Sequence, residues 1–153
     1  MNLFGVLDVA GSALGAERLR AEVVASNMAN LETTRTAEGG PYHRHFTVFR
    51  AQATPHIPLQ LASFGPGFGP AFRLAGQPGG VRIDRVVTDT APPFLRYQPG
   101  HPDADAKGYV AYPSINPVEE MTDLMGAVRA YEMNASSVQA AKQMIQQSID
   151  ILK

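Results

Sequence analysis

Hydrophobic and polar residues follow a helical period at both ends of the chain and lose that period in between. Near the N-terminus, apolar or small residues recur at alternating steps of three and four, which is the spacing of a heptad seam. These positions are Leu7, Ala10, Leu14, Ala21, Val24, Met28 and Leu31. Glu17 fills the one charged slot of the series. The pattern predicts a helix of about eight turns over residues 3–31.

The C-terminal segment repeats this pattern over residues 118–153. Its apolar positions are Met121, Leu124, Val128, Tyr131, Ala135, Val138, Ile145, Ile149 and Leu152, with Lys142 as the one charged member. The sequence therefore predicts a second long helix. One such stripe is typical of any helix on a globular core, but two matched stripes at opposite ends of a chain favour pairing with each other.

An antiparallel pairing would bring the two charged seam positions together. If Leu14 lies opposite Ile145, then Glu17 lies opposite Lys142. The other layers are then Leu7 with Leu152, Ala10 with Ile149, Ala21 with Val138, Val24 with Ala135, Met28 with Tyr131, and Leu31 with Val128. A pair of opposite charges would select this register against slipped ones, as polar seam residues do in coiled coils. The alternative is that both charged side chains point to solvent.

The middle of the chain has a different composition, because all 12 prolines lie between Pro41 and Pro117. Runs rich in β-branched and aromatic residues, each bounded by Gly or Pro, predict short strands at 43–51, 81–87 and 108–112. The stretch 64–80 interleaves Phe with Gly and Pro. It predicts an extended loop, either an ordinary surface loop or one that becomes ordered against a partner.

The fold class predicted from these patterns is α+β. The terminal helices pair as an antiparallel coiled coil, and a small β-rich, Gly/Pro-rich segment is inserted between them. The chain divides into residues 1–35, 36–117 and 118–153. Pro117 precedes Glu119 and Glu120, which we expect near the positive end of the C-terminal helix dipole.

Composition narrows the possible functions. The formal net charge of -1 offers no basic surface for nucleic acid. No apolar run approaches the roughly 20 residues of a membrane span, so we expect no direct membrane insertion. The first 15 residues lack the basic leader and unbroken apolar stretch of a Sec signal peptide, so any export needs another route. The chain has no cysteine, which excludes disulfides and thiolate metal sites.

Candidate catalytic and metal-ligating residues are few. His43 and His45 point to one side of a predicted strand and could begin a zinc site, but no third ligand follows at a suitable spacing. An exposed strand pair is the simpler interpretation. The stretch GSALG around Ser12 lacks the G-x-S-x-G spacing of a nucleophile elbow and lies within a predicted helix.

The stretch HPDADAKGY contains Asp103 and Asp105. An EF-hand calcium loop would need an oxygen ligand at the place of Lys107 and a Glu at the place of Ser114. Capped turns are therefore the better interpretation of this stretch. We predict no catalytic residue, no metal site and no cofactor.

The end of the first helix carries the most specific motif. DVAGSALGAERLRAEVVASNMANLETTRT, followed by EGGPY, resembles the N-terminal signature of flagellar rod, hook and related axial proteins. PGHPDADAKGYVAYPSINPVEEMTDLMGAVRAYEMNASSVQAAKQM resembles the proximal rod members of that family. The family pattern Ser/Asn-Asn-x-Ala-Asn-x-x-Thr is matched here by Ser26, Asn27, Ala29, Asn30 and Thr33, while Ser26 and Glu32 stand where Asn is frequent. We expect the amides of Asn27 and Asn30 to bond helix-end carbonyls.

This resemblance implies a structural subunit of the periplasm-spanning rod of the bacterial flagellar basal body. It implies export by the flagellar type III apparatus without a Sec signal, and terminal helices that form the inner layer of a tubular axis and transmit motor torque. The implied partners are copies of itself, other rod proteins, and basal-body ring and rod-adaptor proteins. The expected assembly residues are Leu7, Leu14, Glu17, Asn27, Met28, Asn30, Thr33, Val128, Tyr131, Lys142, Ile145, Ile149 and Leu152.

Two other classes of function stay open at this point. One is a secreted coiled-coil adaptor or effector of a type III secretion system. The other is a small metal-dependent enzyme that uses His43, His45 and the Asp103 region. The rod subunit is the best supported class, because the resemblance covers both ends of the chain. Apolar residues on further helix faces, such as Leu19 and Met125, need more than one partner helix, which neighbouring subunits would supply.

Overall fold

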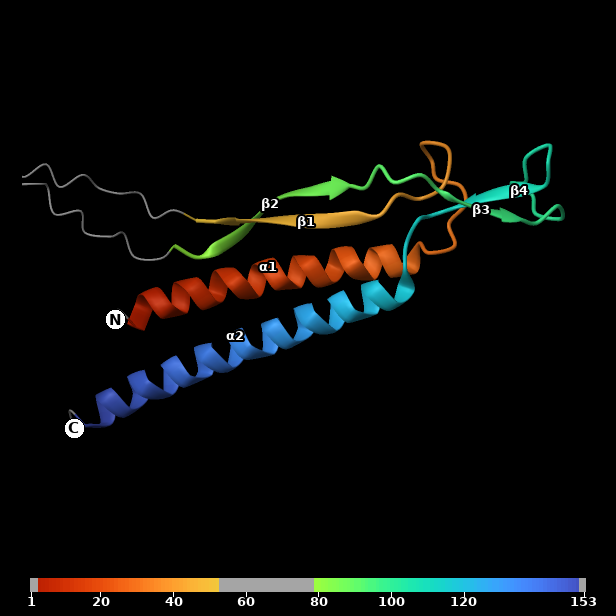
Figure 1. Cartoon of the computed structure of the whole chain (residues 1–153). Coiled ribbons are helices and arrows are strands. Elements are labelled where there is room, and N and C mark those ends of the chain that lie inside the picture. The colour runs from red at the N-terminus through yellow and green to blue at the C-terminus, as the bar shows by residue number, and fades with distance from the viewer. Residues whose placement is uncertain (1–2, 53–78, 152–153) are drawn as a thin grey trace, which may run out of the picture.

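The computed structural model describes residues 3–52 and 79–151. Its elements are α1 (Leu3–Ala29), β1 (His45–Ala51), β2 (Val81–Thr88), β3 (Phe94–Tyr97), β4 (Tyr109–Tyr112) and α2 (Pro117–Ile151). The β1–β2 hairpin lies along α1, and α2 packs on the other side of α1, so that the first helix is the middle layer (Figure 1). The fold is α+β, as predicted. Most of the predicted loop at 64–80 lies outside the described residues.

Both long helices form as the periodicity predicts. α1 has 27 residues and α2 has 35. Pro117 opens α2, where its missing N–H costs nothing, and the side-chain oxygen of Asn116 accepts the Val118 N–H at 3.1 Å as an N-cap. Glu119 and Glu120 lie in the first turn as expected. Neither described helix has the length and apolarity that crossing a membrane requires.

The face that α2 turns toward α1 is made largely of small residues. Ala127 and Ala141 are fully buried, whereas Met121, Val128 and Ile149 are about half exposed. The predicted seam of α2 is therefore correct at Leu124, Ala135, Val138 and Ile145, which are half-buried. It is displaced by one residue where buried Ala127 and Ala141 precede the exposed Val128 and Lys142. Small side chains allow the two helices to approach closely, so the contact is narrower than the apolar stripe. Part of the stripe remains uncovered by α1.

The predicted register between the helices is wrong, although their antiparallel direction is correct. Arg20 pairs with Asp123 at 3.3 Å, and Asn27 bonds Glu120 at 3.0 Å. The predicted layers would have placed Gln139 and Glu132 at those positions, an error of about four turns. Glu17 instead lies 3.7 Å from Arg20 on its own helix, and Lys142 is exposed. As a result, α2 extends past the N-terminal end of α1 (Figure 1).

The strands form two separate antiparallel hairpins. In the first, His45 pairs with Thr88 and Ala51 with Val81, with a bulge next to Val48 and Phe49. In the second, β3 pairs with β4. The predictions at 43–51, 81–87 and 108–112 correspond to β1, β2 and β4. β3 was missed because its four residues are all exposed and show no alternation of apolar and polar positions.

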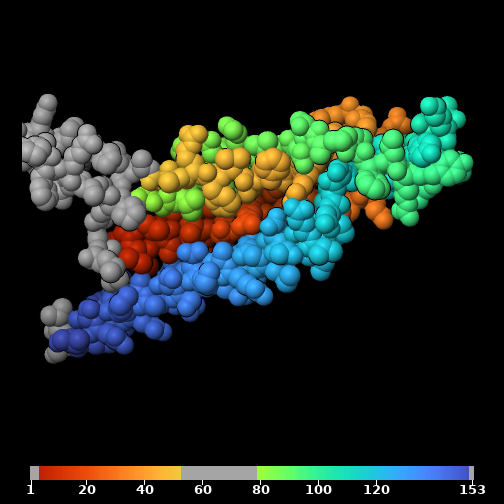
Figure 2. All heavy atoms as spheres, in the orientation of Figure 1, coloured from red at the N-terminus to blue at the C-terminus, as the bar shows by residue number. Residues whose placement is uncertain are grey.

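The described part of the molecule is elongated, with the β3–β4 hairpin at one end and the start of α1 and the end of α2 toward the other (Figure 2). Gly108 closes the β3–β4 hairpin with a φ of 82°. A Cβ at this position would lie 2.9 Å from the ring of Tyr97. Both the positive φ and the close approach of the ring therefore require glycine here.

The observed register predicts which helix positions can be crosslinked. Because the chain has no cysteine, engineered pairs would be its only thiols. We expect cysteines in place of Arg20 and Asp123 to be joined by a short bismaleimide in the purified protein, because these side chains meet across the helix pair. Cysteines in place of Leu14 and Ile145 serve as the control and should stay unlinked, since they lie several turns apart in this register. Efficient linking of the control pair would contradict it.

Candidate functional site

The carboxamide of Asn27 joins three parts of the fold that lie far apart in the sequence. Its oxygen accepts the His45 N–H at 2.9 Å and the Tyr42 hydroxyl at 3.2 Å. Its nitrogen donates to the His45 carbonyl at 2.7 Å and to the Glu120 carboxylate at 3.0 Å. Asn27 is only 1% exposed, and all four of its hydrogen-bonding positions are used. We call Asn27, Tyr42, Arg44, His45 and Glu120 the Asn27 cluster.

These partners determine the orientation of the amide and the tautomer of the imidazole. A flipped amide would place its NH2 group against the His45 N–H and its oxygen against the Glu120 carboxylate, so only one orientation is allowed. The Tyr42 hydroxyl donates its proton to Asn27. The same hydroxyl lies 2.8 Å from Nδ1 of His45. With its one proton directed at Asn27, its oxygen is free to accept a hydrogen bond from Nδ1–H, which favours the tautomer of His45 that is protonated on Nδ1.

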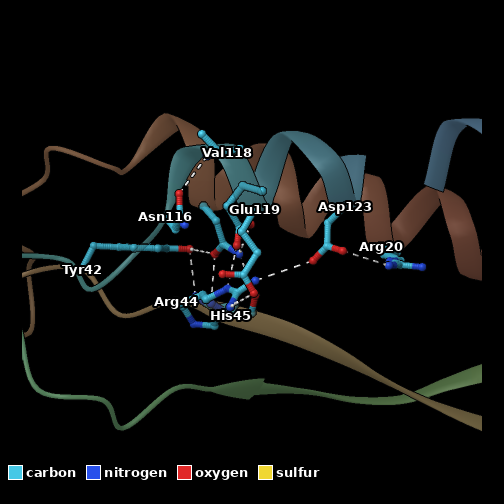
Figure 3. Close-up of polar contacts among 10 residues, drawn as sticks. Arg20, Tyr42, Arg44, His45, Asn116, Val118, Glu119 and Asp123 are labelled. Atoms are coloured by element: carbon cyan, nitrogen blue, oxygen red, sulfur yellow. Dashed lines mark hydrogen bonds and ion pairs between the residues drawn. The ribbon is translucent and has the colours of Figure 1, made fainter. Parts of the chain in front are cut away.

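Arg44 connects the start of β1 to the first turns of α2. Its Nε lies 2.6 Å from Glu120, and its other nitrogens lie 3.4 Å from Glu119 and 3.6 Å from Asp123. Figure 3 shows Arg44 facing the carboxylates of Glu119 and Asp123, with Arg20 of α1 on the far side of Asp123. The Glu120 side chain is 1% exposed, so its charge depends on Arg44 for compensation.

Such a buried ion pair adds little net stability compared with an apolar contact, because both charges lose their hydration. The ion pair does make any arrangement that separates Arg44 from Glu120 less stable. Sliding α2 by one turn along α1 would separate Glu120 from both Asn27 and Arg44 and leave a buried charge without a partner. The Asn27 cluster thus sets the position of α2 along α1.

Asn30 and Thr33 close the C-terminal end of α1 as the motif predicts. Both the N–H and the side-chain amide of Asn30 donate to the Ser26 carbonyl, at 3.1 and 2.9 Å. Thr33 donates its hydroxyl to the Asn30 side-chain oxygen at 3.1 Å. The same expectation for Asn27 is wrong, because its amide bonds β1 and α2 and no carbonyl of its own helix. Asn27 lies two residues before the end of α1, and its side chain faces β1 and α2.

Of the residues weighed for metal chemistry, His45 and Asp103 make structural contacts. His43 is exposed, while His45 is half-buried and stacks at a tilt on Tyr42. Asp103 accepts the Thr34 hydroxyl at 2.8 Å and pairs with Arg35 at 3.7 Å, which ties the loop before β4 to the segment after α1. Within residues 3–52 and 79–151, no three His, Asp or Glu side chains are grouped so that they could hold a metal ion.

The other predicted assembly residues fall on two faces of the helix pair. Leu7, Leu14, Glu17, Met28 and Ile145 are half-buried. The exposed group comprises Val128, Tyr131, Lys142 and Ile149. Leu152 lies outside the described residues. The structure therefore brings the first group between packed elements and leaves the second group on the open face of α2.

Sequence reasoning missed Arg44, Tyr42 and the structural part played by Glu120. A signal was present for the carboxylates. Glu119, Glu120 and Asp123 are close together at the start of α2, and no Lys or Arg lies between residues 117 and 128. Charges of one sign without local partners require counter-charges from another element, and Arg44 and Arg20 supply them.

Comparisons with known proteins match both helical ends of the chain. A family described as "Flagella basal body rod protein" matches residues 7–35, which hold most of α1 and the Asn27–Asn30 motif. A second, described as "Flagellar basal body rod FlgEFG protein C-terminal", matches residues 106–151, which include β4 and α2. Two terminal helices joined by a β-rich insert, together with these matches, define the class as flagellar rod proteins.

Full-length relatives specify the family within this class. The chain is 40% identical to the flagellar basal-body rod protein FlgC of Borreliella burgdorferi, over 100% of this chain and 99% of that protein. It is 35% identical to FlgC of Bacillus subtilis (strain 168), over 100% of both chains. It is also 35% identical to FlgC of Salmonella typhimurium, over 99% of this chain and 98% of that protein. The chain belongs to the FlgC family of flagellar basal-body rod proteins.

The Asn27 cluster predicts a large difference between two similar substitutions. Asn27→Ala should lower the free energy of unfolding by about 3–5 kcal/mol, because it leaves the His45 backbone groups without partners and removes the amide that donates to the buried Glu120 carboxylate. Asn30→Ala removes only the side-chain bonds to Ser26 and Thr33 at the end of α1 and should cost about 1 kcal/mol. Urea unfolding of the purified proteins followed by circular dichroism measures both. Equal losses for the two variants would contradict the central position of Asn27.

Proposed function

We propose that this protein is a structural subunit of the proximal rod of the bacterial flagellar basal body. In this proposal it polymerises through its terminal helices and transmits motor torque. The observation that carries the proposal is an exposed apolar stripe on α2, in a chain whose full-length relatives are named as rod proteins. The fold is consistent with a structural subunit, since its two buried polar side chains among the described residues, Asn27 and Glu120, bond each other.

The stripe consists of Val118, Met121, Met125 and Val128, at steps of three, four and three residues along α2. Their exposed fractions run from 70% at Val118 to 46% at Val128. A row of large apolar side chains on one helix face is typical of a surface that another helix covers. Burying it would contribute roughly 25 cal/mol for each Å² of apolar area.

Neighbouring rod subunits, whether copies of this chain or related rod proteins, are the partners proposed for the stripe. A contact between two different faces of successive subunits does not close on itself and generates a helical array. We propose that residues 1–35 and 118–153 form the inner layer of the tube, with α1 and α2 paired as an antiparallel coiled coil. Residues 36–117 would lie outside this layer.

The predicted assembly residues divide into two groups in this proposal. Val128, Tyr131, Lys142 and Ile149, which are exposed, would contact neighbouring subunits, together with Leu152. Leu7, Leu14, Glu17, Met28 and Ile145 would support the helix pair within the subunit. Asn27, Asn30 and Thr33 would act indirectly, because they fix the direction in which the chain leaves α1.

We further propose that the chain is exported by the flagellar type III apparatus without a Sec signal peptide and resides in the periplasm-spanning rod. Basal-body ring proteins and rod-adaptor proteins would be its other partners. The rod proteins named among its relatives support this location. They do not favour the alternative of a secreted coiled-coil adaptor or effector. An enzymatic function has no support from the same comparisons.

Two aspartate substitutions on α2 test the proposal. Val128→Asp places a charge at the C-terminal end of the stripe and should abolish or strongly reduce swimming when expressed in a strain deleted for the gene. Gln139→Asp adds the same charge at an exposed polar position of the same helix and should leave swimming near the level of the unaltered protein. Motility in soft agar and electron microscopy of isolated basal bodies provide the measurements.

Circular dichroism of the purified variants shows whether both fold. A folded Val128→Asp protein that supports normal rods would exclude the stripe as the assembly surface. Normal motility of the deletion strain itself would overturn the proposed function as a whole.

A further inference from the structure

The β1–β2 hairpin has two open edges, and the hydrogen-bond ladder shows where their unpaired groups point. Asp89 N–H donates to the Arg44 carbonyl at 2.7 Å just before His45 pairs with Thr88. In an antiparallel ladder, bonded and non-bonded residue pairs alternate. The N–H and C=O of His45 therefore point away from β2. The same alternation applies at the other end of the hairpin, where the Gln52 N–H donates to the Gly80 carbonyl at 2.7 Å. The Val81 N–H consequently points away from β1.

A side chain of α1 satisfies these groups at each edge. Asn27 bonds both the N–H and the C=O of His45, as an adjoining strand would. Ser12 Oγ accepts the Val81 N–H at 3.0 Å and donates its own proton to the Val9 carbonyl at 2.7 Å. A Cβ on Gly80 would overlap the Ser12 hydroxyl, so glycine at this position lets the strand approach the helix. Each strand is thus capped at its first residue.

The two caps lie at opposite ends and on opposite edges of the hairpin. Fifteen residues of helix separate Ser12 from Asn27, a length of about 22 Å at 1.5 Å per residue. The six steps of β1 from His45 to Ala51, which faces Val81, cover about 20 Å. The helix and the strand therefore match in length, and α1 crosses the hairpin diagonally from the β2 edge to the β1 edge. Figure 1 shows the hairpin lying along this part of α1.

Open strand edges are sites at which a second chain can add a strand, and a two-stranded hairpin has no neighbouring strands to cover them. Exposed apolar residues of the hairpin, including Phe46, Phe49 and Val86, would favour such pairing. We propose that Ser12 and Asn27 cap the two edges and prevent the hairpin from pairing with the hairpin of a second copy of the chain. This proposal concerns the free subunit and does not rest on the proposed function.

Ser12 offers the cleaner test, because replacing Asn27 also removes the side-chain amide that donates a hydrogen bond to Glu120. In the full-length protein, Ser12→Ala leaves a good helix former and removes only the hydroxyl. We expect hydrogen exchange of the Val81 amide to become faster by on the order of tenfold, as for the loss of one hydrogen bond. We also expect sedimentation velocity to show more dimer and larger species than for the unaltered protein. Ser12→Thr retains a hydroxyl and should restore both properties.

Two further variants separate capping from general destabilisation. Leu14→Ala weakens the packing of α1 while both caps remain, and should not increase self-association. Val86→Pro, combined with Ser12→Ala, removes an N–H that points to the open β2 edge without breaking a bond to β1, and should suppress the self-association.

Three outcomes would overturn the proposal. The first is a Ser12→Ala protein whose Val81 exchange and sedimentation are unchanged. The second is self-association of Leu14→Ala equal to that of Ser12→Ala. The third is association of Ser12→Ala that persists when Val86→Pro is added. Motility need not be measured, so failure here leaves the proposed rod function untouched.

Discussion

The buried carboxamide of Asn27 is the interaction on which the arrangement of the other elements depends. It bonds the start of β1 and the start of α2 from the end of α1, although Asn27 and Glu120 are 93 residues apart. An amide that is nearly inaccessible to water must find all its partners within the protein, since each unmet bond costs free energy. The hairpin and the second helix therefore have one favoured position relative to the first.

The terminal helices could be predicted from the sequence, but their relative position could not. Periodicity identifies the apolar face of a helix, because every residue on that face recurs at steps of three and four. It contains no information on how far one helix slides along another when the seam is mostly aliphatic. The charge pairing of Glu17 with Lys142 was the only sequence criterion for the register, and Glu17 pairs with Arg20 instead. The Asn27–Glu120 contact, which periodicity does not detect, determines the register.

The residues of the candidate site also divide into those whose contacts follow from local sequence and those whose contacts depend on the tertiary fold. The motif at the end of α1 identified Asn27, Asn30 and Thr33, and the closing bonds of Asn30 follow from local geometry. The partners of Asn27 depend on tertiary contacts and were not predictable, as the separation of Arg44 from Glu120 in the chain illustrates. β3 was missed for another reason, since both its faces are exposed and its residues show no apolar alternation.

In this subunit the Asn27 cluster holds α1, β1 and α2 together, while the apolar stripe of α2 remains exposed. Exchange of the His45 amide hydrogen tests this view most directly, because that N–H bonds only the Asn27 side chain at the open edge of β1. In the purified protein, we predict that it exchanges as slowly as the most protected amides of α1, which open only on global unfolding. Exchange of the His45 amide as fast as that of the exposed Glu38 would show that the Asn27 cluster does not hold the fold together.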